Sequence, residues 1–242
     1  MGTLLIAGAG MAFWGLKGTR SGAKPEPEAT DGEEIPLQHV PEGFPMGLSA
    51  SQNFALHLFE QPGPEFDHAE LPPETGSSRT YDRLSIAGGE FLAVTEASSP
   101  PRIWFDTNGN GDLTDESAPS RAEKEGGVVP NFYTLQLPSR SGGESFPYRL
   151  WIFPSQQGGT RFYAACHMAG EIELGGETAK VVLFDGNADG DYSDDPVGID
   201  ADGDGKLSDS ELIRKGETRE LNGIPVTLQA ASPDGRSVRL KR

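Results

Sequence analysis

Short runs of alternating apolar and polar residues, separated by Gly, Pro, Ser and Asn clusters, fill the chain from about residue 46 onward. This alternation is typical of strands with one buried face, because successive side chains of a strand point to opposite sides of the sheet. The runs are NFALHLF at 53–59, NFYTLQL at 131–137, YRLWIF at 148–153, RFYAAC at 161–166, AKVVLF at 179–184 and IPVTLQA at 224–230. We therefore expect a mainly β fold of antiparallel sheets, arranged as one sandwich or as two abutting small sandwiches.

Three segments share a plan of strand, tight turn and strand. They are LSIAGGEFLAV at 84–94, IELGGETAKVVLF at 172–184 and RELNGIPVTLQ at 219–229. A Gly pair or Asn-Gly between two apolar runs is typical of a two-residue hairpin turn, so each segment predicts a β-hairpin.

An internal repeat marks two related halves of the chain. IWFDTNGNGDLTDES, from residue 103, and VLFDGNADGDYSDDP, from residue 182, align without gaps over an apolar stretch and an Asp-rich loop. Linker-like composition lies between them, near residues 120–145. We expect an N-terminal β half at 46–128 and a C-terminal β half at 129–242.

The stretch DADGDGKLSDSE at 200–211, called the third loop below, matches the twelve-residue calcium-binding loop at every diagnostic position. The expected ligands, at loop positions 1, 3, 5, 7, 9 and 12, are Asp200, Asp202, Asp204, the Lys206 carbonyl, Ser208 and Glu211. Ca²⁺ takes about six to eight oxygen ligands, which alternate side chains on a tightly curved backbone can supply. Gly205 at position 6 allows the bend, since glycine reaches positive φ at little steric cost.

The end of the third loop predicts one short helix. Ser208 and Glu211 form an S-x-x-E capping box, so the residues that close the site are expected to start a helix in SELIRKG. Leu207 at position 8 is expected to turn away from the ion and anchor the loop on the core.

Two further loops keep positions 1 to 9 of this pattern and diverge at the end. The first loop, 106–117, offers as ligands Asp106, Asn108, Asn110, the Asp112 carbonyl and Thr114; the second loop, 185–196, offers Asp185, Asn187, Asp189, the Asp191 carbonyl and Ser193. Position 12 is Ser117 in one and Pro196 in the other, so the bidentate glutamate is missing. Candidates to replace it are Asp115 or Glu116 in the first loop and Asp194 or Asp195 in the second. We expect these two sites to be weaker than the third.

The charge of the chain agrees with cations as partners. Its formal net charge is −17, which argues against nucleic acid and against acidic membrane surfaces, because both are polyanions. Divalent ions among the carboxylates would also explain how a folded protein tolerates so dense an acidic segment. The alternative interpretation is that Asn-Gly and Asp-Gly are here only good hairpin turns.

The loops resemble the EF-hand-type calcium loops that occur outside helical EF-hand pairs, as in dockerin modules. The wider pattern, a Gly-Gly hairpin running into VVLFDGNADGDYSDD and then IDADGDGKLS, is similar to uncharacterised secreted bacterial β-proteins with such loops. The resemblance covers residues 172–239 well and 84–116 loosely. It implies calcium binding at the positions named above, and it supplies neither a substrate nor a reaction.

The N-terminus predicts export. Residues 1–20 hold an apolar run too short to span a bilayer and are expected to be a signal peptide or a short membrane anchor, with a buried apolar segment as the remaining alternative. Residues 21–45 are rich in Pro and Glu without periodicity and are expected to be a disordered linker. The protein is then secreted, periplasmic or on the cell surface, and meets a membrane only through an uncleaved N-terminal segment.

No catalytic motif stands out. The single cysteine, Cys166, lies next to His167 on a predicted strand, where neighbouring side chains point to opposite faces, so the two cannot form a nucleophile-base pair. His39, His57 and His68 lack zinc-ligand spacing. The leading hypothesis is a non-enzymatic, calcium-stabilised β-sheet protein. A calcium-dependent carbohydrate- or protein-binding module is the alternative, with Trp104, Trp151 and Tyr148 as candidate sugar-binding aromatics, and a hydrolase with structural calcium is the third.

Overall fold

The computed structural model describes residues 32–41, 43, 54–55, 57–59, 61–98, 102–116, 120–121, 131–138, 144–154 and 160–242. The chain divides into two units, Met1–Asp31 and Gly32–Arg242, and all described residues belong to the second. The predicted signal or anchor at 1–20 lies outside them. Across the described ranges, no helix combines the length and the apolar character needed to cross a membrane.

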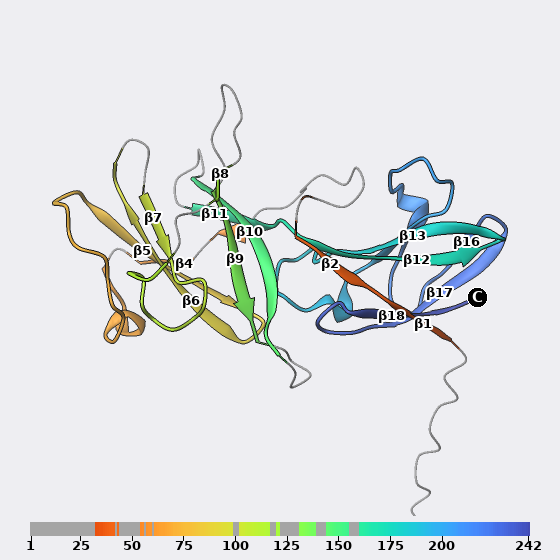
Figure 1. Cartoon of the computed structure of the whole chain (residues 1–242), viewed down its shortest axis with the longest axis horizontal. Helices are drawn as coiled ribbons and strands as arrows, with labels where there is room; N and C mark the ends of the chain where they lie inside the picture. The colour runs from red at the N-terminus through yellow and green to blue at the C-terminus, as the bar shows by residue number, and fades with distance from the viewer. Residues whose placement is uncertain are drawn as a thin grey trace, which may run out of the picture. The chain divides into compact units, whose positions relative to one another are not determined.

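The second unit is an all-β, sandwich-like fold of four antiparallel sheets (Figure 1). Its strands are β1 (Glu33–Pro36), β2 (Gln38–Val40), β3 (Phe54–Ala55), β4 (His57–Phe59), β5 (Arg79–Ile86), β6 (Gly89–Glu96), β7 (Arg102–Phe105), β8 (Ser120–Arg121), β9 (Asn131–Leu137), β10 (Phe146–Pro154), β11 (Thr160–Ala164), β12 (His167–Leu174), β13 (Glu177–Leu183), β14 (Val197–Asp200), β15 (Leu212–Ile213), β16 (Thr218–Leu221), β17 (Ile224–Ala231) and β18 (Ser237–Lys241). Three single-turn 3₁₀ helices accompany them: η1 (Pro64–Phe66), η2 (Tyr192–Asp194) and η3 (Asp209–Glu211). The predicted mainly β, antiparallel fold is confirmed.

Two sheets come from the middle of the chain, and the other two combine its first described strands with its last ones. Sheet D has the order β4-β5-β6-β7 and sheet C the order β3-β11-β10-β9-β8; sheet B runs β15-β14-β13-β12-β2 and sheet A β1-β18-β17-β16. Sheets C and D therefore use residues 54–164, and sheets A and B use 33–40 together with 167–241. The division lies near residue 165 rather than at the predicted 128/129, because β9–β11 pair with β3 and β8.

Residues 33–40, expected in the disordered linker, instead form two edge strands. β1 pairs with β18 and β2 with β12, and Leu37 between them donates its N–H to the Arg236 carbonyl at 2.7 Å. Ile35 and Leu37 are buried while their neighbours are exposed. Only these two buried positions alternate with exposed ones, and Pro36, which an edge strand tolerates, lies between them. The Pro- and Glu-rich composition therefore indicated a linker rather than strands.

The three predicted hairpins are present, each with a two-residue turn. Their turn residues are Ala87–Gly88, Gly175–Gly176 and Asn222–Gly223, and all six have positive φ between 51° and 89°. That conformation matches the right-handed twist of the flanking strands. In the first hairpin the turn uses Ala87 and Gly88, so Gly89 already pairs with Ile86 as part of β6.

Two local expectations differ from the structure. The run NFALHLF holds two strands rather than one, since β3 belongs to sheet C and β4 to sheet D. The helix expected in SELIRKG stops after the single turn of η3. Ile213 is fully buried and pairs with Val197, so Leu212–Ile213 continues as β15 beside β14.

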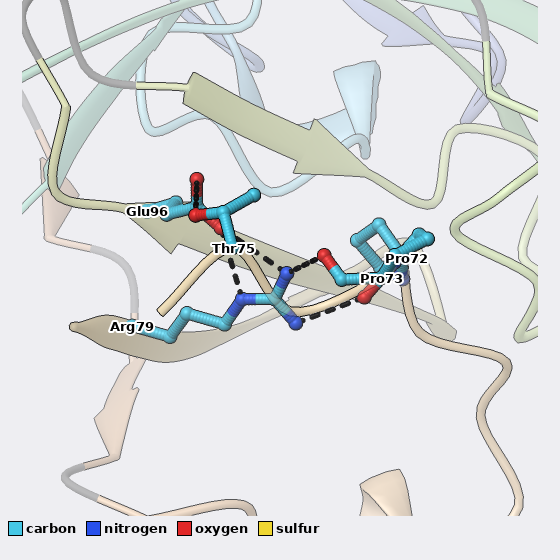
Figure 2. A network of polar contacts seen from close by, with 5 residues as sticks. All are labelled: Pro72, Pro73, Thr75, Arg79 and Glu96. Atoms are coloured by element: carbon cyan, nitrogen blue, oxygen red, sulfur yellow. Dashed lines mark hydrogen bonds and ion pairs between the residues drawn. The ribbon is translucent and has the colours of Figure 1, made fainter. Parts of the chain in front are cut away.

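One core runs through the unit, and a small second cluster covers the other face of sheet D. The second cluster contains Phe66, Leu92, Val94 and Leu113. Near it a buried ion pair fixes residues 72–75 against the ends of β5 and β6: Arg79 contacts Glu96 at 3.1 Å and donates to the Pro72 and Pro73 carbonyls (Figure 2). Thr75 donates to the same carboxylate, and its hydrogen bond and the Arg79 charge lower the pKa of Glu96.

Candidate metal centre

The three Asp-rich loops begin at or just after the end of a strand and share the same succession of turns. In each, the side chain at position 3 accepts the N–H of position 5, and the side chain at position 5 accepts the N–H of position 7. These bonds are Asn108–Asn110 (2.9 Å) and Asn110–Asp112 (2.7 Å), Asn187–Asp189 (3.1 Å) and Asp189–Asp191 (2.8 Å), and Asp202–Asp204 (3.1 Å) and Asp204–Lys206 (2.8 Å). Consecutive turns of this kind curl the chain so that alternate side chains lie on its inner side.

Two positions of each loop take the left-handed conformation. Position 6 is Gly111, Gly190 or Gly205 with φ of 75° to 79°, as the sequence predicts. Position 4 does the same, with Gly109, Ala188 and Gly203 at φ of 54° to 71°. We did not predict a left-handed residue at position 4, although glycine at this position in two of the three loops indicated one.

Position 8 anchors every loop. Leu113, Tyr192 and Leu207 are all buried. Leu113 lies in the second cluster behind sheet D, Tyr192 lies in the main core, and Leu207 packs on Gly198, where a Cβ would come within 2.4 Å of it. The expectation for Leu207 thus extends to the other two loops.

An acidic residue at the end of each loop reaches back to the N–H of position 2. Glu211 accepts from Ala201 at 2.9 Å, Glu116 from Thr107 at 2.7 Å and Asp195 from Gly186 at 3.0 Å. Glu116 and Asp195, both at position 11, are therefore the structural counterparts of Glu211 at position 12. The alternatives Asp115 and Asp194 are exposed, and Asp115 instead accepts from the Asn110 amide at 3.0 Å.

The third loop brings three carboxylates to one point. One oxygen each of Asp200, Asp202 and Asp204 lies within 4.8 Å of the others, and no second such group of acidic, His or Cys side chains occurs among the described residues. Asp200 is only 5 % exposed, and its Oδ1 has no hydrogen-bond partner. Leaving a carboxylate oxygen buried and unpaired is costly, so this arrangement suits a bound cation.

Glu211 closes the third loop and is held in place on both sides. One carboxylate oxygen accepts the N–H and the hydroxyl of Ser208, each at 2.8 Å, and the other accepts from Ala201. Burial would raise the pKa of Glu211, but these hydrogen bonds outweigh it, so its pKa lies below the ordinary value. The carboxylate is thus ionised, as a metal ligand must be.

The first loop has its carboxylate at position 1 more fully satisfied. Asp106 is 1 % exposed; its Oδ1 accepts from Gly109 and Asn110, and its Oδ2 from Gly111 at 3.0 Å. Burial raises the pKa of Asp106. Farther along, the Asp112 carboxylate accepts from the Thr114 hydroxyl at 2.6 Å, which lowers the pKa of Asp112. Because this side chain is bonded to Thr114, the backbone carbonyl of Asp112 remains the candidate oxygen at position 7.

The second loop is the most buried of the three. Asp185 accepts the Tyr148 hydroxyl at 2.6 Å and the Gly190 N–H at 2.7 Å on the same oxygen, and Tyr148 is fully buried in β10 of sheet C. Asp195 is 5 % exposed and its Oδ2 has no hydrogen-bond partner. Burial, together with the charge of Asp185, raises the pKa of Asp195 to about 8, and burial raises that of Asp185 to about 6.

Contacts from distant parts of the chain hold the second loop. Ala87 in the β5–β6 turn donates its N–H to the Asp189 carbonyl at 2.9 Å, and Tyr192 donates its N–H to the Pro233 carbonyl at 3.1 Å. A Cβ on Gly190 would lie 2.8 Å from Ala87 and 2.9 Å from Leu137. None of these partners is close in sequence, so no pattern within the loop announced them.

The residues weighed for catalysis lie apart from these loops or in the core. Cys166 is buried, and burial raises the pKa of its thiol to about 11, which leaves it almost fully protonated at neutral pH. Tyr148, considered as a sugar-binding aromatic, is a core residue bound to Asp185. Burial lowers the pKa of both His39 and His167, and His167 contacts the Gly43 carbonyl at 3.3 Å.

Outside the loops, a second buried carboxyl joins Glu96 among the described residues. Asp82 of β5 is 0 % exposed, and neither of its oxygens has a hydrogen-bond partner among the described residues. Burial raises its pKa to about 6. Its neighbours in the sheet are Leu58 and Ala93, so it has none of the convergent oxygens that distinguish the loops.

Comparison of the chain with protein-family models, with curated proteins and with solved structures finds no match. The case for a function therefore depends on the geometry of the loops and on the chemistry of their donor atoms.

Proposed function

We propose that this chain is an exported calcium-binding β-sheet protein whose Asp-rich loops hold Ca²⁺ as a structural ion. The observation that carries the proposal is the third loop, where oxygens of Asp200, Asp202 and Asp204 lie within 4.8 Å of one another and the Asp200 Oδ1 is buried without a partner. Export is proposed from the apolar segment at residues 1–20.

The donor set favours calcium over other ions. All candidate ligands are carboxylate, amide, hydroxyl or carbonyl oxygens, whereas zinc and copper prefer sites with nitrogen or sulfur donors. Mg²⁺ keeps several waters and requires near-octahedral geometry, while Ca²⁺ accepts more protein oxygens in flexible arrangements. Asp200, Asp202, Asp204, the Lys206 carbonyl, Ser208 and Glu211 would hold the ion in the third loop.

The shared conformation extends the proposal to the other loops. Asp106, Asn108, Asn110 and the Asp112 carbonyl would hold an ion with Glu116 closing the first site, and Asp185, Asn187, Asp189 and the Asp191 carbonyl would do so with Asp195 closing the second. The unpaired Asp195 oxygen supports the second site in the same way as the Asp200 oxygen supports the third. In each case the ion's contribution is to neutralise carboxylates that otherwise repel one another.

Calorimetric titration of the full chain with CaCl₂, after treatment with a chelator, tests the proposal. The parent is expected to bind calcium, and Asp200→Ala to lose one site. Asp209→Ala is the matched control, because it removes the same charge from an exposed position of the same loop that supplies no ligand. Equal stoichiometry in parent and Asp200→Ala would remove the third loop from the proposal.

Thermal unfolding gives an independent measure. An ion that binds only the folded state adds about 2.7 kcal/mol at a hundredfold excess over its dissociation constant. For a chain of this size that corresponds to a rise in Tm of about 5–10 °C per site. A Tm that is the same in chelator and in millimolar calcium would contradict the proposed structural role.

A further inference from the structure

The outward face of sheet C carries a cluster of aromatic side chains. Phe132 of β9, Trp151 and Phe153 of β10 and Tyr163 of β11 alternate with core residues and are half-buried. Trp151 pairs in register with both Phe132 and Tyr163. Ring centroids lie 6.2 Å apart for Phe132–Trp151, 5.6 Å for Trp151–Tyr163 and 5.2 Å for Phe153–Tyr163. These four residues are the aromatic face.

Two arginines border the aromatic face. Arg149 lies over the Phe132 ring at 4.4 Å from its centroid, and Arg161 pairs in register with Phe153. The Arg161 guanidinium has no hydrogen bond or ion pair with the described residues. At the described outward positions of β9, β10 and β11 there is no Asp or Glu, although the chain holds 37 acidic residues against 20 basic ones.

Aromatic rings on a sheet surface, with basic groups beside them, bind a ligand that offers flat apolar faces and negative charge. A pyranose ring presents C–H groups on its faces, and a uronic acid adds a carboxylate that an arginine can bind through two hydrogen bonds. Nucleic acid also stacks on aromatics, but it carries one charge per about 1.7 Å of duplex, which a chain of net charge −17 would repel. Carboxylates spaced along a polysaccharide are a much sparser charge.

We propose that the aromatic face of sheet C binds an acidic polysaccharide, with Trp151 stacking on a sugar ring and Arg161 pairing with a uronic-acid carboxylate. The face is formed within one sheet and does not include any loop residue, so this proposal stands or falls separately from the calcium sites.

The test is a fluorescence titration of the full chain, in calcium and again in chelator, with a hyaluronan octasaccharide, which carries a carboxylate on alternate sugars. We expect a saturable change in tryptophan emission. Trp151→Leu is expected to lower the affinity about tenfold or more, as for a central aromatic contact. Trp104→Leu is the matched control: although the sequence also made Trp104 a candidate, it is half-buried in β7 of sheet D against the second cluster, outside the aromatic face, and its loss should leave the affinity unchanged.

Arg161→Gln separates the charge from the stacking. It is expected to weaken hyaluronan binding several-fold and to leave any binding of neutral cellohexaose unchanged. Each variant is first compared with the parent by circular dichroism and Tm. No saturable signal with hyaluronan, equal affinity of parent and Trp151→Leu, or tighter binding of single-stranded oligo-dT would overturn the proposal. Cellohexaose bound as tightly as hyaluronan would overturn the assignment to an acidic ligand.

Discussion

The second and third loops have the same pattern of oxygens and the same turns, yet they lie in opposite environments. In the second loop, positions 5 and 6 contact the distant β5–β6 hairpin and the position-1 carboxylate accepts a hydroxyl from sheet C, whereas positions 3 to 7 of the third loop are exposed. Ligand geometry is thus a local property of these loops, since the same Asx turns recur in both. The energetic role of a loop depends on what packs against it.

This difference changes what an ion would contribute. In the third loop water already solvates Asp202 and Asp204, so a cation mainly orders the loop. In the second loop Asp185 and Asp195 are withdrawn from water beside each other, and a cation would offset both desolvation and repulsion. The sequence alone predicted that the second site is the weaker one; burial argues that it matters more for stability.

The largest expected effect distinguishes the two loops by one methyl group. Gly190→Ala places a Cβ 2.8–3.1 Å from Ala87, Leu137 and Ile86 at φ of 75°, whereas Gly205→Ala meets nothing within 4 Å at φ of 79°. We expect a loss in the free energy of unfolding of about 3–5 kcal/mol for Gly190→Ala, from strain plus overpacking, and of about 1–2 kcal/mol for Gly205→Ala, from strain alone. Chemical denaturation measures both, and equal losses would show that the second loop is not packed as described.

The next effect tests a buried carboxyl without a loop around it. The pKa of Asp82 is raised to about 6, so the folded state binds more protons than the unfolded state between about pH 4 and 6. Stability therefore falls as pH rises through this window and stays lower above it. Asp82→Asn is expected to remove that fall and to add up to about 3 kcal/mol at pH 7, with little change at pH 4.

Denaturation curves at pH 4 and pH 7, with and without calcium, measure the Asp82 effect. The gain at pH 7 should be the same in calcium and in chelator, because no described group of convergent oxygens includes Asp82. A gain in the free energy of unfolding that appears only in chelator would indicate that Asp82 interacts with the proposed ion sites. Its raised pKa could then not be attributed to burial alone.

The smallest effect tests the link from sheet C to the second loop. Tyr148→Phe removes the hydroxyl that donates to Asp185, and we expect a loss of about 1.5–3 kcal/mol in chelator, as for hydrogen bonds to charged groups. Tyr133→Phe is the control, because it removes a hydroxyl bonded at 3.2 Å to the Ile103 carbonyl, and should cost about 0.5–1.5 kcal/mol. Denaturant titration compares the free energies of unfolding of the two variants. A smaller loss for Tyr148→Phe than for Tyr133→Phe would contradict the proposed link between sheet C and the second loop.

Sequence patterns predicted the strands and turns whose conformation depends on neighbouring residues. The alternation in NFYTLQL and YRLWIF, the Asn222–Gly223 turn and the glycine at position 6 of each loop all depend on residues within a few positions. The two-residue hairpins and the mainly β fold followed from them. For the residue equivalent to Glu211, the sequence left two candidates in each of the other loops. The hydrogen bonds to the N–H of position 2 identify Glu116 and Asp195.

Long-range pairing was beyond the sequence. Nothing near Ile35 indicates that β1 will find β18, and nothing near Asp185 indicates that Tyr148, 37 residues away, will bind it. The division of NFALHLF between two sheets has the same origin. Such contacts depend on how distant strands pair and how sheets pack on one another. The periodicity of a single sequence carries no information about either.

The pairing of β1 with β18 also sets an order of events during folding. Glu33 lies opposite Leu240, so β1 must wait for a strand that is synthesised about 200 residues later. Closing so long a loop is slow and entropically costly. Sheet A therefore gains its edge strand only after β18 has been synthesised, and until then β1 has no sheet partner to shield it from proteases and chaperones.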